Sequence, residues 1–298
     1  MRIGYPCLNW TLGCKGSKTF RIASYSDNRL IESIENNLDC LLKMLEFNVR
    51  NNIFFFRLSS VLVPFASHPV CKYDWQRHFR KTFLNIGNFV KKNKIRISMH
   101  PDQFTLINSP DKNIFNRSHK ELSYHARVLD LMGLDSTAKI QIHVGGVYGD
   151  KQKSIDRFIY RFHKLDNIIR KRLVVENDDS SYTLKNCLSI SAKTRIPVLF
   201  DVFHHSLNSS GESIHDAINV ALKTWKKKDG ILMVDYSLQK KGARAGSHAE
   251  SINIKSFKSF LEKSKPYDFD IMLEIKDKEK SALKAVKALR TDRRFVKY

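Results

Sequence analysis

Short apolar runs recur along this chain, and each one ends on a residue that can bind a metal ion or an anion. Near-continuous apolar runs of this length are typical of strands that are buried on both faces of a parallel sheet. An eighth strand is expected at Arg2–Pro6. The seven runs and the residues that close them are Ile53–Phe56 with Arg57, Ile95–Met99 with His100, Ile140–Ile142 with His143, Leu173–Val175 with Glu176, Val198–Phe200 with Asp201, Ile231–Val234 with Asp235, and Ile271–Leu273 with Glu274.

The segments between these runs have the spacing of amphipathic helices, in which apolar residues recur every three or four positions. One stripe consists of Leu30, Ile34, Leu38, Leu41, Leu42 and Leu45. The same pattern predicts seven more helices, at Trp75–Val90, His119–Leu131, Ile155–Ile169, Ser181–Ile190, Ile214–Trp225, Ile252–Leu261 and Lys280–Leu289.

Eight strands that alternate with eight helices predict a (β/α)8 TIM barrel. Spread over 298 residues, they give about 37 residues per unit, the usual size for this fold. An open doubly wound sheet is disfavoured, because the segment after the first strand lacks a glycine-rich phosphate loop. No linker or change of composition divides the chain, so we expect a single domain over residues 1–298.

In a parallel barrel the carboxyl ends of all strands meet at one rim, where active sites are built. Two histidines and four carboxylates close the predicted strands, so the pattern predicts a site for more than one metal ion. A mixed set of this kind suits Mn²⁺ or Zn²⁺ better than Ca²⁺, whose ligands are all oxygens. Arg57 stays protonated and is expected to pair with a phosphate or a carboxylate instead.

Several residues next to these strand ends extend the predicted site. His204 lies three residues after Asp201 and is favoured over His205, which is expected on a surface loop. His248 lies in the loop after the seventh strand. Aromatic and amide side chains at strand ends can stack on distorted bases or replace a displaced base, whereas the alternative is ordinary packing of the barrel. These side chains are Tyr5, Asn9, Gln103 and Phe104.

The charge of the chain indicates a polyanionic partner. There are 52 Lys and Arg residues against 30 Asp and Glu, a formal net charge of +22, and nucleic acid is the commonest intracellular polyanion. A genome rich in A and T would also encode many lysines, so charge alone leaves this partner undecided. No apolar stretch approaches the roughly 20 residues that span a bilayer, and residues 1–12 do not resemble a signal peptide, so we expect an intracellular protein without a membrane partner.

The cysteine pattern predicts no disulfide framework. The five cysteines are an odd number, and no two of them form a CxxC pair. Cys7 and Cys14 lie seven residues apart beside the first strand, which is only a weak metal or redox signal. We therefore expect all five to be structural or free thiols.

Taken together, these motifs resemble the UV damage endonuclease family. The resemblance covers nearly the whole chain in order, and it rests on Gly4-Tyr5-Pro6-Cys7-Leu8-Asn9, Arg57-Leu58-Ser59-Ser60 with Ser67-His68-Pro69, His100-Pro101-Asp102-Gln103-Phe104, Ile142-His143-Val144-Gly145-Gly146, Leu173-Val174-Val175-Glu176-Asn177-Asp178-Asp179, Phe200-Asp201-Val202-Phe203-His204-His205, and Leu273-Glu274.

The resemblance implies a metal-dependent DNA repair enzyme with a TIM barrel related to endonuclease IV. Such an enzyme nicks DNA immediately 5′ of UV photoproducts, and sometimes of abasic sites, with two or three divalent ions. Mn²⁺ is expected, with Zn²⁺ or Mg²⁺ as alternatives. It further implies a first ion on His100, His143 and Glu176, a second on Glu176, Asp201, Asp235 and Glu274, and a third on His204 and His248.

Other residues receive roles by the same resemblance. Glu176 bridges two ions, and Glu274 orients the attacking water, so both are catalytic candidates. His68 is expected near the metals, together with Arg57. Tyr5, Asn9, Gln103 and Phe104 correspond to the positions that probe the lesion.

The sequence departs from the family pattern at two places. Some members carry a Lys and a His at the positions of Met233 and Asp235, and that Lys is carboxylated to assist the metals. The occupancy of a third ion site is therefore left open. Phe104 stands where some relatives have a Tyr, so stacking is kept without the hydroxyl.

Two other functions fit part of the pattern. A sugar isomerase or epimerase would share the metals on the strand ends but needs no basic surface. A non-catalytic nucleic-acid-binding protein could keep the metal cluster without turnover. For the endonuclease we expect damaged double-stranded DNA as partner, a monomer, and a cytoplasmic location at the nucleoid, or a nuclear one if the source is eukaryotic or viral.

Overall fold

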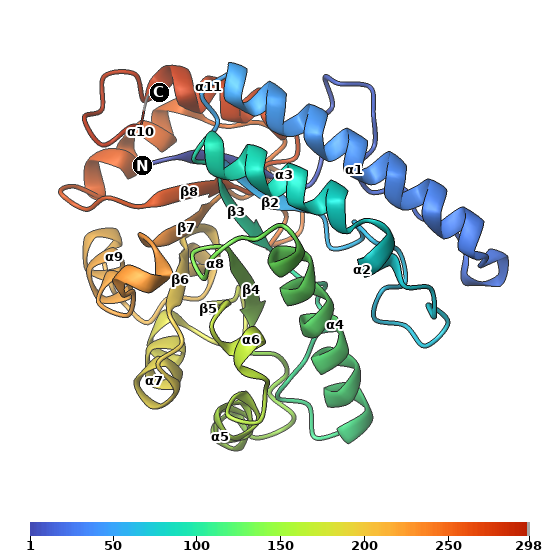
Figure 1. The fold of residues 1–298 in the computed structure, drawn as a ribbon. Helices are drawn as coiled ribbons and strands as arrows, with labels where there is room; N and C mark the ends of the chain where they lie inside the picture. The colour runs from blue at the N-terminus through green and yellow to red at the C-terminus, as the bar shows by residue number, and fades with distance from the viewer. Residues whose placement is uncertain (297–298) are drawn as a thin grey trace.

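A closed barrel of parallel strands forms the centre of the protein. The computed structural model describes residues 1–296, so the last two residues of the predicted domain lie outside it. Each strand pairs with its neighbours in sequence, and β8 closes on β1, which confirms the predicted barrel (Figure 1). The strands are β1 (Ile3–Pro6), β2 (Phe55–Leu58), β3 (Arg96–Met99), β4 (Lys139–His143), β5 (Leu173–Glu176), β6 (Val198–Asp201), β7 (Met233–Tyr236) and β8 (Asp270–Leu273).

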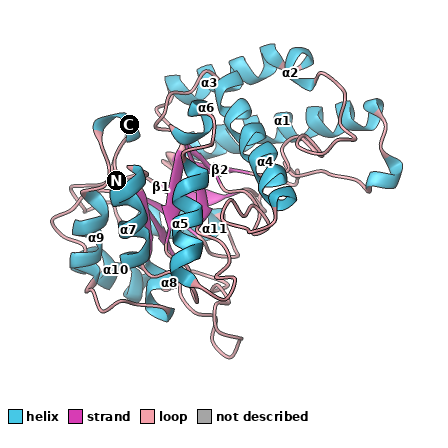
Figure 2. Ribbon diagram, turned by 90° about the horizontal axis from the view of Figure 1, so that it is seen from below, coloured by secondary structure: helices cyan, strands magenta, loops and turns pink. Residues whose placement is uncertain are grey.

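Helices surround this barrel, as Figure 2 shows from below. Their apolar stripes pack on the outward faces of the strands and complete a continuous core. Within residues 1–296 no helix is both long and apolar enough to cross a bilayer. The α-helices are α1 (Asp27–Arg50), α2 (Trp75–His78), α3 (Arg80–Lys92), α4 (Lys112–Leu131), α5 (Lys151–Phe162), α6 (Asn167–Arg170), α7 (Leu184–Thr194), α8 (Val202–Leu207), α9 (Ile214–Leu222), α10 (Ile254–Lys263) and α11 (Glu279–Ala288), with short 3₁₀ turns at Ile22–Ser24 and Lys227–Asp229.

The structure corrects several predicted helices. The helix expected at Trp75–Val90 is divided into α2 and α3 at Phe79, and the one expected at Ile155–Ile169 is divided into α5 and α6. The helix α4 begins earlier than predicted, because the Asp111 side chain caps it by accepting a hydrogen bond from the Asn113 N–H. Local capping and breaks of this kind do not alter the apolar period on which the predictions were based.

The strand register aligns the functional strand ends. His143 lies opposite Glu176 across β4 and β5, and Asp201 lies opposite Asp235 across β6 and β7. The backbone N–H of Glu274 continues the ladder beyond β8 by donating to the Tyr236 carbonyl. At the turn after β4, Gly145 has a φ of +111°, and a side chain there would collide with Asn108. The ends of neighbouring strands therefore reach the same level of the rim.

Buried charges close the opposite end of the barrel. Lys139 donates to Asp229 over 2.6 Å, and Arg96 donates to Asp270 over 2.9 Å. The backbone N–H of Arg2 also donates to Asp270, and all of Lys139, Asp229 and Asp270 are buried. We call Arg96, Lys139, Asp229 and Asp270 the base network.

One cysteine prediction was wrong, because Cys14 and Cys40 form a disulfide. Cys40 faces inward from α1, and the β1–α1 loop folds back along that helix until the two Cα atoms are 5.8 Å apart. Hydrogen bonds from Asn36 to the Lys15 carbonyl and from Asn37 to the Lys18 carbonyl hold the loop in this place. The contact joins residues 26 positions apart, so spacing along the sequence gave no indication of it. Cys7, Cys71 and Cys187 are free thiols, as expected.

Candidate metal centre

The structure brings the eight predicted metal-binding residues together around one mouth of the barrel. His143, Glu176 and Asp201 are the last residues of their strands, His100 and Glu274 directly follow theirs, and Asp235 lies within β7. His204 comes from α8, and His248 from the loop between β7 and α10. We call this set, His100, His143, Glu176, Asp201, His204, Asp235, His248 and Glu274, the metal rim.

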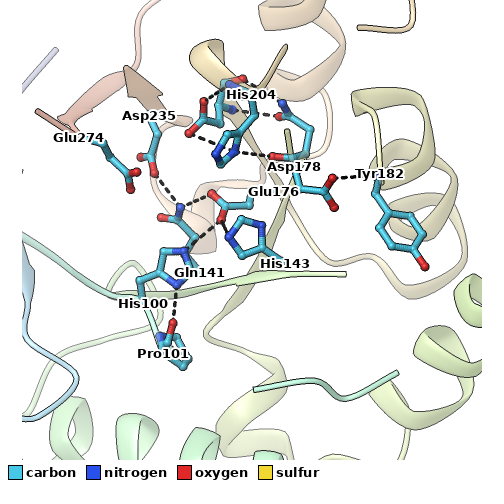
Figure 3. A network of polar contacts seen from close by, with 12 residues as sticks. His100, Pro101, Gln141, His143, Glu176, Asp178, Tyr182, His204, Asp235 and Glu274 are labelled. Carbon is cyan, nitrogen blue, oxygen red and sulfur yellow. Dashed lines mark hydrogen bonds and ion pairs between the residues drawn. The ribbon is translucent and has the colours of Figure 1, made fainter. Parts of the chain in front are cut away.

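Glu176 lies at the centre of the rim, between two imidazoles (Figure 3). Its Oε1 atom is 3.0 Å from His100 Nε2 and 2.8 Å from His143 Nε2. The Nδ1–H of His100 donates to the Pro101 carbonyl over 2.8 Å, which fixes the ring and leaves Nε2 toward the carboxylate. These three residues form a triad that could hold one metal ion.

Two more triads share residues with the first. Glu176 groups with Asp201 and His204, and Asp201 groups in turn with Asp235 and Glu274; in each triad the ligand atoms lie within 4.8 Å of one another. The four residues expected to hold the second ion therefore do not form one group. Glu176 and Asp201 each belong to two triads, whereas Asp235 and Glu274 belong only to the third. His204 joins the second triad, whereas His248 lies beside the third, with its Nε2 3.7 Å from Glu274.

The backbone around α8 positions His204. Its Nδ1–H donates to the Asn177 carbonyl over 3.0 Å, so Nε2 is left for a ligand. Asn177 also exchanges hydrogen bonds with the backbone of Asp201, and the Asp201 side chain caps α8 by accepting from the His204 N–H. The loop expected after Asp201 is therefore a short helix, and His205 on it is buried rather than exposed.

Arg57 and Gln141 link the carboxylates from below. Arg57 donates to Asp235 Oδ2 over 2.6 Å and also to Glu274, which confirms the carboxylate partner predicted for it. Gln141 accepts from Arg57 and donates to both Glu176 and Asp235. Sequence reasoning missed Gln141, although an amide between two isoleucines of a buried strand was a signal.

The rim has more acidic groups than permanently charged cations. With all four carboxylates ionised and the histidines neutral, as metal binding requires, Arg57, which pairs with Asp235 and Glu274, would leave three negative charges for bound ions to balance. Burial raises the pKa of Asp201 to about 7, although His204 opposes this, and burial likewise raises the pKa of Asp235 well above its usual range.

The other two carboxylates are kept ionised by nearby cations. Burial would raise the pKa of Glu176, but His143 and His100 lower it, and Glu176 in turn raises the pKa of His143 to about 9. Arg57 lowers the pKa of Glu274 against the effect of burial. Carboxylates with such different pKa values, packed side by side, are typical of functional sites.

This donor set fits divalent ions. Two ligand atoms bound to one ion at about 2.1 Å, roughly at right angles, are about 3 Å apart, which is the separation of Glu176 Oε1 from both imidazoles. Among residues 1–296, Asp235 Oδ1 is buried without a hydrogen-bond partner, as are Nδ1 of His143 and of His248. Two divalent ions would more than balance the three excess charges.

The predicted lesion-contacting residues occupy two different environments. Gln103 and Phe104 are exposed in the loop after β3, with 72% of the Phe104 side chain accessible. Tyr5 and Asn9 are instead buried, and their polar groups bond within the protein. The Asn9 amide donates to the Tyr5 hydroxyl, which donates to Asn48 on α1. The structure therefore does not present Tyr5 and Asn9 to a ligand.

The place predicted for His68 near the metals stays a prediction. Its side chain is exposed on the β2–α2 loop, where its ring packs on Phe65 and its Nδ1 accepts from the Val70 N–H. None of its recorded contacts within residues 1–296 is with the metal rim. A proline directly after His68 resembles the His100 motif, but here the histidine does not end a strand.

Comparisons with known proteins identify a family for the chain. The sequence model of the UV-endonuclease UvdE family matches residues 1–297. A UV DNA damage endonuclease of Clostridium perfringens is 40% identical over 292 residues, which cover 97% of this chain and 71% of the relative.

Solved structures separate the family from the wider fold. The crystal structure of SacUVDE superposes with a TM-score of 0.93 at 46% identity, and the match covers 97% of this chain and 98% of that one. D-Psicose 3-epimerase from Clostridium cellulolyticum H10 has a TM-score of 0.57 at 12% identity over 87% of this chain and 94% of the epimerase, a likeness of fold alone.

Proposed function

The chain belongs to the UV-endonuclease UvdE family, and on this premise we propose that it nicks damaged DNA with two or three divalent ions held by the metal rim. The cut lies immediately 5′ of UV photoproducts, and of abasic sites, and leaves a 3′-hydroxyl. Membership in a family of DNA endonucleases sets aside the isomerase or epimerase alternative.

The observation that carries the metal dependence is the sharing of Glu176 and Asp201 between adjoining triads. A carboxylate with two oxygens can bind one ion on each side, so shared carboxylates favour ions held close together. Two ions held close together suit phosphodiester hydrolysis, because bound ions would activate water and neutralise charge on the attacked phosphate. Mn²⁺ fits the mixed nitrogen and oxygen donors, and Zn²⁺ or Mg²⁺ are the alternatives.

The protein groups of the rim would position the reactants. Glu274 stays ionised beside Arg57, with its second oxygen 3.7 Å from His248, so it can accept a hydrogen bond from a water and orient it. Glu176 would hold the spacing of the ions. Arg57 would keep Glu274 and Asp235 from turning toward each other.

The positive charge of the chain supports DNA as its partner. A net charge of +22 attracts the phosphate backbone of double-stranded DNA, and this attraction weakens as salt rises. We propose that the protein acts as a monomer at the chromosome, in the cytoplasm if the host is bacterial.

Nicking of plasmid DNA tests the proposal. Purified protein is incubated with UV-irradiated and untreated supercoiled plasmid, in Mn²⁺ and in excess chelator. Conversion of only the irradiated plasmid to open circles, and only with metal, is expected. An end-labelled duplex with one photoproduct then maps the cut. Equal and negligible nicking of both plasmids with Mn²⁺ contradicts the proposal, and a cut on the 3′ side contradicts its polarity.

A further inference from the structure

Trp10 exposes an indole beside the metal rim. Of the three tryptophans of the chain, Trp75 and Trp225 are buried, whereas 53% of Trp10 is accessible. Trp10 directly follows Asn9 in the β1–α1 loop. Asn9, a candidate for contact with the lesion, is buried, whereas Trp10 faces outward. An exposed aromatic ring offers a face on which a base can stack.

The loop that carries Trp10 is fixed by a buried carboxylate. Glu279, at the start of α11, accepts from the Trp10 backbone N–H over 3.0 Å and from the Thr11 hydroxyl over 2.8 Å. The indole Nε1–H donates to the Lys276 carbonyl over 3.1 Å. Both N–H groups of Trp10 are therefore satisfied by the protein, and only the ring is left for a ligand.

These anchors place the ring against the loops that follow β7 and β8. Lys276 is two residues beyond Glu274, and its own N–H donates to the carbonyl of Ala249, the residue after His248. Trp10 thus lies against the loops that deliver two residues of the metal rim. Beneath it, the hydrogen bonds from Asn9 through Tyr5 to Asn48 tie the start of the loop to α1.

We propose that the Trp10 indole stacks on a base of the damaged DNA next to the incision site. This inference rests on the proposed function, and it assigns a stacking contact to Trp10 in the β1–α1 loop rather than to Tyr5 in β1. An indole held at both N–H groups stacks without losing side-chain freedom. Its stacking requires no particular base, because every base has an aromatic face.

Fluorescence offers a direct readout, because Trp10 is the exposed tryptophan. The protein with Mn²⁺ is mixed in a stopped-flow instrument with a duplex that carries one photoproduct. Tryptophan emission is expected to fall before the nick appears, and Trp10→Phe removes that fall. Trp10→Ala is expected to raise the KM for irradiated duplex about tenfold, the effect of one stacked base, with kcat little changed.

Tyr160→Ala is the matched control, since Tyr160 is 63% exposed and belongs to helix α5, not to a loop that carries a rim residue. It should leave KM and the fluorescence change as in the parent. If the emission of the parent protein does not change on binding, or if Trp10→Ala has the parental KM, the stacking proposal is wrong. Nicking of irradiated duplex by the parent protein would still support the proposed function. A parent protein that neither binds nor nicks irradiated duplex overturns both.

Discussion

The two ends of the barrel use buried charges in opposite ways. At the base network, Lys139 meets Asp229 and Arg96 meets Asp270, so each buried cation has a carboxylate. At the metal rim there are four carboxylates, and Arg57, the one arginine in the set, pairs with only two of them, Asp235 and Glu274. One strand contributes to both ends, since β4 begins with Lys139 and ends with His143.

This difference in charge balance suggests that the base network serves stability and the metal rim serves function. A balanced ion pair closes the barrel without needing a ligand, although its desolvation limits what it adds to stability. An excess of buried carboxylates is unfavourable by itself and becomes favourable when cations bind. We therefore expect changes at the rim to reduce metal binding and nicking, and changes at the base to reduce stability alone.

The largest effect is expected from Glu176→Gln, which removes the charge shared by two triads but keeps the shape. Nicking of irradiated DNA should fall about a thousandfold, because a metal ion supplies several kcal/mol of transition-state stabilisation. Calorimetric titration with Mn²⁺ should show fewer or weaker sites, while the circular dichroism spectrum is unchanged. A variant with a near-parental rate would refute the bridging role.

The base should respond in stability instead. Asp229→Ala leaves Lys139 buried without its carboxylate, so the free energy of unfolding in urea should fall by about 3 kcal/mol. The double variant Lys139→Met/Asp229→Leu removes both charges and should recover most of this loss. Mn²⁺ affinity should match the parent in both variants. A large loss of metal binding on Asp229→Ala would show that the two ends are not independent.

A smaller effect is expected from Arg57→Lys, which keeps the charge but not the planar fork that contacts Asp235 and Glu274. Supporting residues of this kind alter metal affinity or activity by about 10–100-fold. Nicking rate and Mn²⁺ affinity are measured together, with Arg50→Lys at the exposed end of α1 as the control. Parental values for both would mean that Arg57 does not position the rim.

The base should also give a pH dependence of stability. Burial lowers the pKa of Lys139 from 10.5 to about 8, so between these values the unfolded chain binds a proton that the folded chain does not. Raising the pH through this window should therefore stabilise the fold. The difference in unfolding free energy between the parent and Lys139→Met, followed from pH 8 to 10.5, isolates this contribution. A difference that does not change with pH would contradict it.

Particular residues show how far sequence reasoning reached. His143 and Glu176 were identified because each closes an apolar run, and strand ends in a parallel barrel share a rim by geometry. Gln141 was missed because it lies within an apolar run rather than at its end. Only the direction of its side chain shows that it bonds to the carboxylates of the rim. Tyr5 was assigned to DNA contact from its place in a motif, but the partners that bury it come from a different part of the chain.

The sequence by itself determined the barrel, its single metal-rich rim and the family, because apolar periodicity and strand-end chemistry are local properties that repeat along the chain. Tertiary structure alone decided how the carboxylates are shared among triads, which of them Arg57 holds, and that Trp10 rather than Tyr5 is exposed. It also decided the bond between Cys14 and Cys40. These outcomes depend on contacts between residues far apart in sequence, whose distances follow from packing and not from spacing.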